Sequence, residues 1–83
     1  MLQIETGMLA KSLAGRDKDE IYMIAKVDND YVYLVDGRLR TYENMKKKKQ
    51  KHIQVISNTI IIEETTNEVV RRRIKEYNHL RSK

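Results

Sequence analysis

The sequence of 83 residues contains no cysteine, no proline, no tryptophan and no phenylalanine. Without cysteine, the fold cannot depend on disulfides or thiolate-bound zinc, and a cysteine nucleophile is excluded. Glycine occurs only at positions 7, 15 and 37, and no stretch has the composition of a flexible linker, so we expect a single domain. No apolar run approaches the ~20 residues that cross a bilayer.

The residue sets that catalysis requires are also missing. No nucleophile–base pair or Gly-rich phosphate loop can be recognised, and the two histidines, His52 and His79, have no carboxylate cluster beside them. We therefore expect no enzyme activity, no metal site and no cofactor. A secretory signal is not expected either, because the first charged residue is the acid Glu5 and no long apolar run follows it. The expected location is the cytoplasm, without membrane association.

Positive charge is concentrated in one segment. The chain has 17 Lys and Arg against 12 Asp and Glu, a net charge of +5. Residues 38–52 contain seven of the basic residues and one acid, Glu43, so this segment alone carries +6 and the remainder is close to neutral. Such a local positive field indicates a nucleic acid as partner, and no recognition helix for DNA can be identified.

Short apolar runs separated by turn residues predict a small, mainly β fold. Residues 21–27 and 31–35 are rich in β-branched and aromatic side chains and flank the Asp-Asn-Asp turn at 28–30, which predicts a hairpin. The Asp-Gly pair at 36–37 predicts a second tight turn. This spacing favours a barrel or meander over βαβ units.

Two further strands are expected in the middle of the chain. Residues 39–42 are a candidate fourth strand and residues 53–56 a candidate fifth strand. Between them, residues 44–51 include four consecutive lysines, which cannot all face a core. We interpret this run as a solvated loop or a strand edge. Residues 60–62 are interpreted as either a last strand or an apolar connector.

The periodicity changes near the C-terminus and predicts a helix at about residues 66–81. Thr65 and Glu68 fit a capping box, with Thr65 as N-cap and Glu68 at the third helical position. Apolar residues then follow at helical spacing: Val70, Ile74, Tyr77 and Leu80. We expect this stripe to pack on the barrel, because the thin core would gain from burying it at ~25 cal/mol per Å². The predicted organisation is a barrel at residues 1–62 and a helix at residues 63–83.

Three segments together resemble a known family. Residues 11–18 (KSLAGRDK), followed by an apolar strand, resemble the KOW motif of several ribosomal proteins and transcription elongation factors. Residues 31–40 (YVYLVDGRLR) and 46–54 (KKKKQKHIQ) resemble the small bacterial KOW-domain RNA-binding proteins, which are kin to archaeal and eukaryotic-type large-subunit ribosomal proteins. The resemblance covers about residues 6–56 and implies an SH3-like barrel of about five strands whose basic loops contact ribosomal RNA.

The resemblance and the charge pattern together define a set of site residues. Those predicted to contact RNA are Ser12, Arg16, Lys18, Arg38, Arg40, Tyr42, Lys46, Lys47, Lys48, Lys49, Lys51 and His52. The turn-forming residues are Gly15, Asp19 and Gly37. Asp19 departs from the family pattern, which has glycine at this place, but aspartate is one of the few other residues that adopt left-handed backbone.

The sequence leaves several interpretations of these residues open. The lysine run either binds phosphate or only solubilises the chain, and Arg16 and Lys18 either contact RNA or pair with Asp17 between them. The tyrosines either stack on bases, where a ring is exposed, or fill the core. Tyr42, beside the basic segment, is open between these two roles, whereas Tyr22 and the pair Tyr31 and Tyr33, which share one strand face, are expected to fill the core. The alternative function is a KOW-type protein-interaction adaptor in transcription or translation, with the helix stripe serving a partner.

Overall fold

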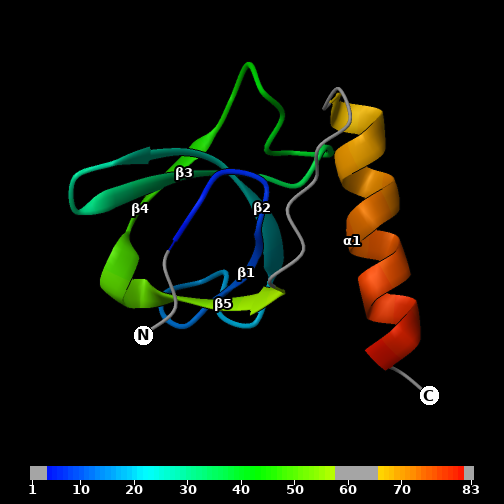
Figure 1. Ribbon diagram of the computed structural model, residues 1–83, viewed down its shortest axis with the longest axis horizontal. Helices are drawn as coiled ribbons and strands as arrows, with labels where there is room; N and C mark the ends of the chain where they lie inside the picture. The colour runs from blue at the N-terminus through cyan, green and yellow to red at the C-terminus, as the bar shows by residue number, and fades with distance from the viewer. Residues whose placement is uncertain (1–3, 58–65, 82–83) are drawn as a thin grey trace.

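The computed structural model describes residues 4–57 and 66–81, in which one antiparallel sheet of five strands carries a single C-terminal helix (Figure 1). The elements are β1 (Leu9–Ser12), β2 (Ile21–Asp28), β3 (Tyr31–Val35), β4 (Lys46–Lys49), the 3-10 helix η1 (Gln50–His52), β5 (Ile53–Ser57) and α1 (Asn67–Arg81). This confirms the predicted small, mainly β barrel with a C-terminal helix. The predicted hairpin is β2–β3, and Asn29 at its turn has a positive φ of 53°.

The order of the strands explains why the sheet curls. In the order β4-β3-β2-β1-β5, the two edge strands are consecutive in sequence and are joined only by η1. A flat sheet would hold these edges about 19 Å apart, at ~4.8 Å per strand. Three residues of 3-10 helix advance only about 6 Å. The sheet therefore has to close on itself, and Figure 1 shows the resulting barrel beside α1.

Alternation along the strands produces two apolar clusters, one on each face of the sheet. The inner cluster, inside the barrel, consists of Met8, Ala10, Tyr22, Ile24, Val32, Leu34 and Ile53. The outer cluster, between the sheet and α1, is built on Leu9, Met23, Val35 and Val70. Tyr22 thus fills the core as predicted.

Helix α1 packs on the barrel through the predicted stripe, with one exception. Val70 is fully buried against the sheet, and Ile74 and Tyr77 are partly buried against the same cluster. Leu80 was expected to continue the stripe, but 70% of it is exposed. The stripe is therefore occupied by the protein's own barrel and is not a vacant surface for a partner helix.

The helix begins one residue later than the capping box predicted. The hydroxyl of Thr66 accepts a hydrogen bond from the backbone N–H of Val69 at 3.2 Å, which makes Thr66 the N-cap. Glu68 accordingly lies at the second helical position and not at the third. Thr65, the predicted N-cap, lies outside the described residues.

The prediction of a fourth strand at residues 39–42 is wrong. The carboxylate of Asp36 accepts hydrogen bonds from the backbone N–H groups of Arg38 (2.8 Å) and Arg40 (3.0 Å), and these bonds fold the chain into a compact loop directly after β3. The fourth strand is the lysine run itself, β4, at the edge of the sheet. Lysine is a poor strand former but is common on edge strands, where its charge prevents pairing with another chain.

Two predictions fall where the structure is not described. Residues 60–62, interpreted as a strand or a connector, and the predicted boundary between barrel and helix after residue 62 both lie outside the described ranges. Within residues 4–57 and 66–81, no helix is long and apolar enough to cross a membrane.

Candidate nucleic-acid interface

The four lysines of β4 divide between the two faces of the sheet. Because side chains alternate along a strand, Lys46 and Lys48 lie on the inner face, opposite Leu34 and Val32 of β3. Lys47 and Lys49 are exposed on the outer face. Only half of the lysine run is therefore directed to solvent, a distinction that the charge count alone does not make.

The inner lysines pair with one carboxylate. The ammonium of Lys48 lies 2.8 Å from Oδ1 of Asp17 and also donates to the backbone carbonyl of Ala14 at 2.8 Å. Lys46 lies 3.7 Å from Oδ2 of the same carboxylate. The side chains of Lys48 and Asp17 are only 11% and 12% exposed. This contact links the β4 edge to the loop between β1 and β2, across 31 residues of sequence.

Two more side chains complete the surroundings of Asp17. Ser12 is fully buried, and its hydroxyl lies 2.9 Å from Oδ1 of Asp17 and 3.1 Å from the carbonyl of Ala14. The hydroxyl of Tyr22 donates to Oδ2 at 3.0 Å. Burial raises the pKa of Asp17, but the hydrogen bonds from Lys48, Ser12 and Tyr22 outweigh it and lower the pKa to about 2. Ser12 and Lys48, both predicted to contact RNA, are thus engaged inside the barrel.

We expect acid unfolding to depend on Asp17. Its folded-state pKa of about 2 is below the ordinary 3.8, so the carboxylate stabilises the fold above about pH 4 and loses this effect as the pH falls toward 2. The difference corresponds to about 2 kcal/mol at neutral pH. Urea unfolding at several pH values between 6 and 2 should show that the free energy of unfolding falls more steeply with decreasing pH for the wild type than for Asp17→Asn. Parallel losses in the two proteins would contradict this assignment.

The β1–β2 loop has the backbone geometry that the sequence predicted. Gly15 and Asp19 have positive φ angles of 87° and 75°, so aspartate does adopt the left-handed conformation where the resembled family has glycine. Arg16 and Lys18 are exposed on this loop. In the described part of the chain, Asp17 pairs with the lysines of β4 and not with its two basic neighbours.

Arg38 and Arg40 lie at the opposite end of β3 from Tyr31, in the loop that contacts the start of α1. Arg38 is exposed and Arg40 is half-buried. Within this loop Gly37 is buried, has a φ of 78°, and accepts a hydrogen bond at its carbonyl from the guanidinium of Arg71 at 2.6 Å. The predicted turn at Gly37 is therefore confirmed, and it also provides the docking point of the helix.

The structure reverses the roles expected of three tyrosines. Tyr42, expected beside the lysines, packs in the outer cluster beneath α1, and its backbone N–H donates to the side-chain oxygen of Asn67 at 3.0 Å. Tyr31 and Tyr33, expected in the core, are only half-buried and lie on the outer face of β3. Helix α1 covers this face near Val35 and Met23, so the end of β3 that carries the two rings stays open.

These rings form part of a surface that we call the tyrosine–lysine face. It lies on the outer side of β2, β3 and β4 and consists of Lys26, Asp28, Tyr31, Tyr33, Lys47 and Lys49. A β-bulge at Ala25 places Lys26 there: it inserts one residue into β2, so that Lys26 pairs with Tyr33 and no longer follows Ile24 toward the interior. The face combines three lysines with one acid.

Each ring of the tyrosine–lysine face has an ammonium group over it. The Nζ atom of Lys47 is 4.4 Å from the centre of the Tyr31 ring, and that of Lys26 is 5.4 Å from the centre of the Tyr33 ring. Such exposed cation–π contacts contribute about 0.5–1 kcal/mol each. Stacking of a nucleic-acid base on an aromatic ring contributes about 1–3 kcal/mol. A base can therefore displace an ammonium from a ring with a net gain.

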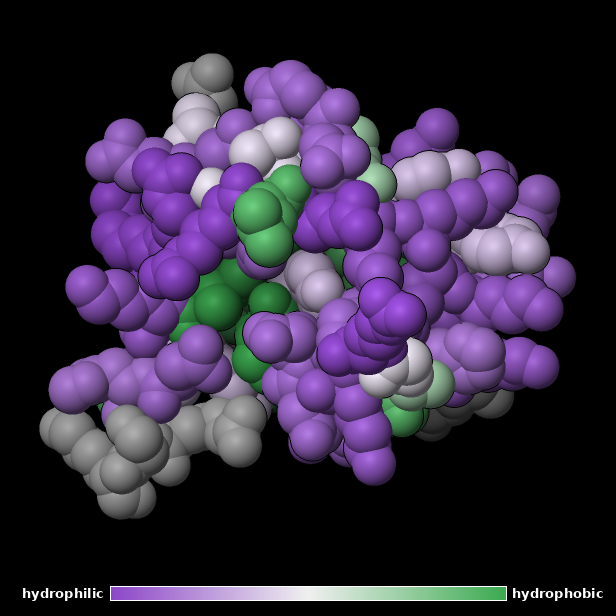
Figure 2. Space-filling model, turned by 180° about the vertical axis from the view of Figure 1, so that it is seen from behind, coloured by the Kyte–Doolittle hydropathy of each residue, from purple (hydrophilic) through white to green (hydrophobic). Residues whose placement is uncertain are grey.

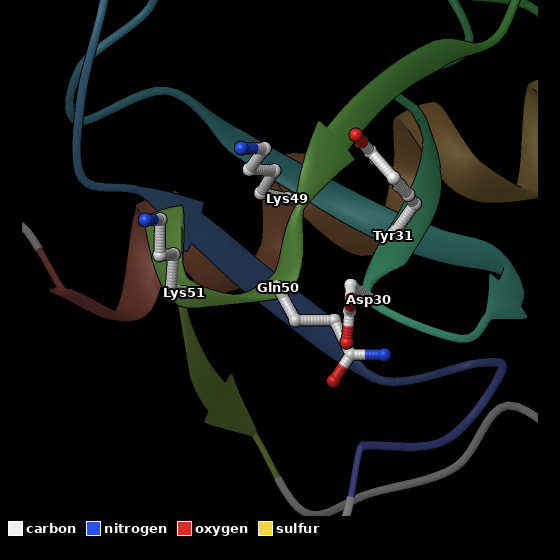
Figure 3. A pocket seen from close by; sticks show the side chains of 5 residues that line it. All are labelled: Asp30, Tyr31, Lys49, Gln50 and Lys51. Carbon is white, nitrogen blue, oxygen red and sulfur yellow. The ribbon is translucent and has the colours of Figure 1, made fainter.

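A hollow of about 390 Å³ adjoins this face at the start of β3 (Figure 3). It is lined by Asp30, Tyr31, Lys49, Gln50 and Lys51. In Figure 3, Lys49 and Lys51 extend toward the same side, whereas Asp30 and Gln50 lie together on the other. Lys51 is exposed and His52 is half-buried in η1. In the described part of the chain, no carboxylate pairs with Lys47, Lys49 or Lys51.

A second groove has a different character. It runs between α1 and the start of β2, and its lining includes Ile21 and Ile74 together with charges of both signs, among them Glu20, Arg38 and Lys75. Figure 2 shows apolar side chains in the hollow between the helix and the barrel, surrounded by a hydrophilic surface. Because its charges are mixed, this groove lacks the uniform positive field that a polyanion requires.

Of the residues predicted to contact RNA, the structure brings Lys47, Lys49 and Lys51 together and leaves Arg16, Lys18, Arg38 and Arg40 on separate loops. Three or more potential metal ligands do not gather anywhere in residues 4–57 and 66–81. Sequence reasoning missed Lys26 and assigned Tyr31 and Tyr33 to the core instead of to this surface. The alternation of side chains along a strand could have placed Tyr31 and Tyr33 on the face of β3 away from the buried Val32 and Leu34. The bulge that places Lys26 has no signal in the sequence.

Comparison with known protein families finds no family model that matches the chain, and comparison with curated proteins finds no significant match. The resemblance to KOW-domain proteins therefore remains a prediction.

Proposed function

We propose that this protein binds RNA through the tyrosine–lysine face and the adjoining Lys51. The observation that supports this proposal is the half of the lysine run that faces solvent: Lys47 and Lys49 are exposed, have no carboxylate partner in the described chain, and flank tyrosine rings. Lysine ammonium groups bind phosphate as point charges. Such contacts hold the RNA backbone in place without reading its sequence.

The proposed target is ribosomal RNA of the large subunit. This part of the proposal comes from the resemblance of residues 11–18, 31–40 and 46–54 to KOW-domain RNA-binding proteins. Arg16 and Lys18 on the β1–β2 loop would add further phosphate contacts, while Ser12 and Lys48 maintain the barrel through Asp17.

Cosedimentation with ribosomes tests the proposal. The variant Lys47→Gln/Lys49→Gln/Lys51→Gln removes three charges from the proposed surface. Its matched control, Arg72→Gln/Arg73→Gln/Lys75→Gln, removes three charges from exposed positions on α1. On sucrose gradients at low salt, we expect the wild type and the control to migrate with large subunits and the first variant to remain at the top. If both variants lose migration equally, total charge and not this surface determines binding.

The salt dependence of the RNA affinity measures how many phosphate contacts this surface makes. Each phosphate contact adds about −0.7 to −0.9 to the slope of log affinity against log salt. Removing three lysines should therefore flatten the slope by about 2 relative to the control variant, measured with purified ribosomal RNA. Migration of the wild type at the top of the gradient at every salt concentration would overturn the ribosomal assignment.

The second candidate is a protein-interaction adaptor, favoured by the groove between α1 and the barrel and by Leu39, which is 83% exposed on the loop after β3. An interface built on apolar contacts should persist as salt increases, whereas phosphate binding should weaken steeply. A ribosome association that is unchanged by salt would favour this candidate.

A further inference from the structure

The tyrosine–lysine face contains more than phosphate binding needs. A surface that only neutralised phosphates would require Lys47, Lys49 and Lys51, with no reason to place aromatic rings between them. Tyr31 and Tyr33 nevertheless occupy the outer positions of β3, two residues apart and roughly 6.6 Å from each other along the strand. Unpaired bases stack on such rings, whereas the bases of a duplex are stacked on one another and inaccessible.

We propose that this face binds unpaired nucleotides of the RNA, with one base on each of the two rings. The inference rests on the proposed RNA-binding function and specifies its ligand as a single-stranded segment. In the free protein, the ammonium groups of Lys47 and Lys26 cover Tyr31 and Tyr33. When RNA binds, each lysine moves to a phosphate and the exposed ring accepts a base.

The arrangement of charges supports this exchange. Lys47 and Lys49 lie directly opposite Tyr33 and Tyr31 on β4, and Lys26 lies opposite Tyr33 on β2. Tyr33 is therefore bordered by a cation on each neighbouring strand, and Tyr31 by a cation on the β4 side alone. Asp28 lies opposite Tyr31 on β2, which directs the phosphates of the strand toward the β4 side.

The hollow beside Tyr31 provides the continuation of the binding path. Its volume of about 390 Å³ falls within the range of small-ligand sites, and Lys49 and Lys51 line it together with Tyr31. A nucleotide next to the base on Tyr31 would have its phosphate between these two ammonium groups.

Binding of oligonucleotides of about 12 residues tests the inference. The probes are oligouridine, an RNA duplex of the same length, and oligothymidine, each followed by fluorescence anisotropy. The variant Tyr31→Leu/Tyr33→Leu removes both rings, and Tyr31→Phe/Tyr33→Phe is the matched control that keeps them. We expect the Leu variant to lose about tenfold affinity for oligouridine per ring, or about 1.4 kcal/mol each. The Phe variant should remain within about threefold of the wild type.

Several outcomes separate this inference from the function on which it rests. If the Leu variant binds oligouridine as well as the wild type while the triple Lys→Gln variant does not, stacking is overturned and phosphate binding stands. A wild type that binds neither single strand nor duplex overturns the RNA-binding function itself. Tighter binding of oligothymidine than of oligouridine would overturn RNA as the ligand.

A second measurement avoids dependence on the stability of the variants. In the wild type, NMR signals of the Tyr31 and Tyr33 ring protons should shift upfield when oligouridine is added, because a stacked base shields them. Signals of Tyr22, which is 5% exposed in the core, should not move. Equal shifts at all three rings, or none at Tyr31 and Tyr33, would contradict base stacking.

Discussion

Substitution of Gly37 by alanine is expected to detach helix α1 from the barrel and to reduce the free energy of unfolding by more than about 3 kcal/mol. A Cβ atom at this position would overlap the carbonyl oxygen of Asn67 and lie 2.7 Å from Cγ of Arg71. The φ of 78° adds strain of about 1–2 kcal/mol for a residue other than glycine. Since a domain of this size has about 4–12 kcal/mol of stability, the loss is a large fraction.

The variant Gly15→Ala is the matched control for this prediction. Gly15 has a similar φ of 87°, but a Cβ there would meet its nearest atoms, in Asp17 and Lys48, at an ordinary 3.6 Å. It should therefore cost only the backbone strain, about 1–2 kcal/mol. Thermal unfolding measures the difference, and hydrogen exchange of the Val70 amide reports whether the helix has separated. Equal losses in both variants would show that the helix does not depend on the close approach at Gly37.

Replacement of Asp17 by alanine is expected to cost about 3 kcal/mol or more, because it leaves the ammonium of Lys48 buried without its carboxylate. The hydroxyls of Ser12 and Tyr22 lose the same acceptor. For a domain of this length, the melting temperature should fall by more than about 10 °C. Thermal unfolding followed by circular dichroism provides the measurement.

The exposed acid Asp30 supplies the control for the Asp17 substitution. Asp30→Ala removes the same charge from a surface position and should change the stability by no more than about 0.5 kcal/mol. In the double variant Asp17→Leu/Lys48→Met, apolar groups replace both partners, and it should be more stable than Asp17→Ala because no charge remains buried alone. If Asp17→Ala and Asp30→Ala have the same stability, the carboxylate does not hold the β4 edge to the β1–β2 loop.

Where residues near one another in the chain determine the conformation, the sequence was sufficient to predict that conformation. The Asp-Asn-Asp turn and its flanking β-branched runs predicted the β2–β3 hairpin, and Asn29 takes the left-handed backbone that such a turn requires. The stripe that includes Val70 and Ile74 predicted both the helix and the face that it buries. Asp19 also has a positive φ, as the resemblance to a family with glycine at this place implied. These features depend on residues near one another in the chain.

The lysine run shows where local chemistry is not sufficient. Residues 46–49 have low strand propensity and high charge, so the sequence left open whether they form a loop or a strand edge. They form β4 because β3 offers an unpaired edge and because Asp17, from a distant loop, neutralises the inner lysines. The sequence assigned one role to the whole run, whereas the sheet gives adjacent lysines different roles.

By itself, the sequence determined the mainly β class, the hairpin, the helix and the concentration of positive charge in residues 38–52. Only the tertiary structure decided which side chains share a surface, because that depends on how far α1 covers the sheet and on the bulge at Ala25. Helix α1 covers the sheet only as far as Val35 and Met23. Tyr31 and Tyr33 therefore lie outside the core, in which the sequence had placed them. Pairing between distant strands then sets Lys26 and Lys47 against those rings, a contact that spacing along the chain cannot specify.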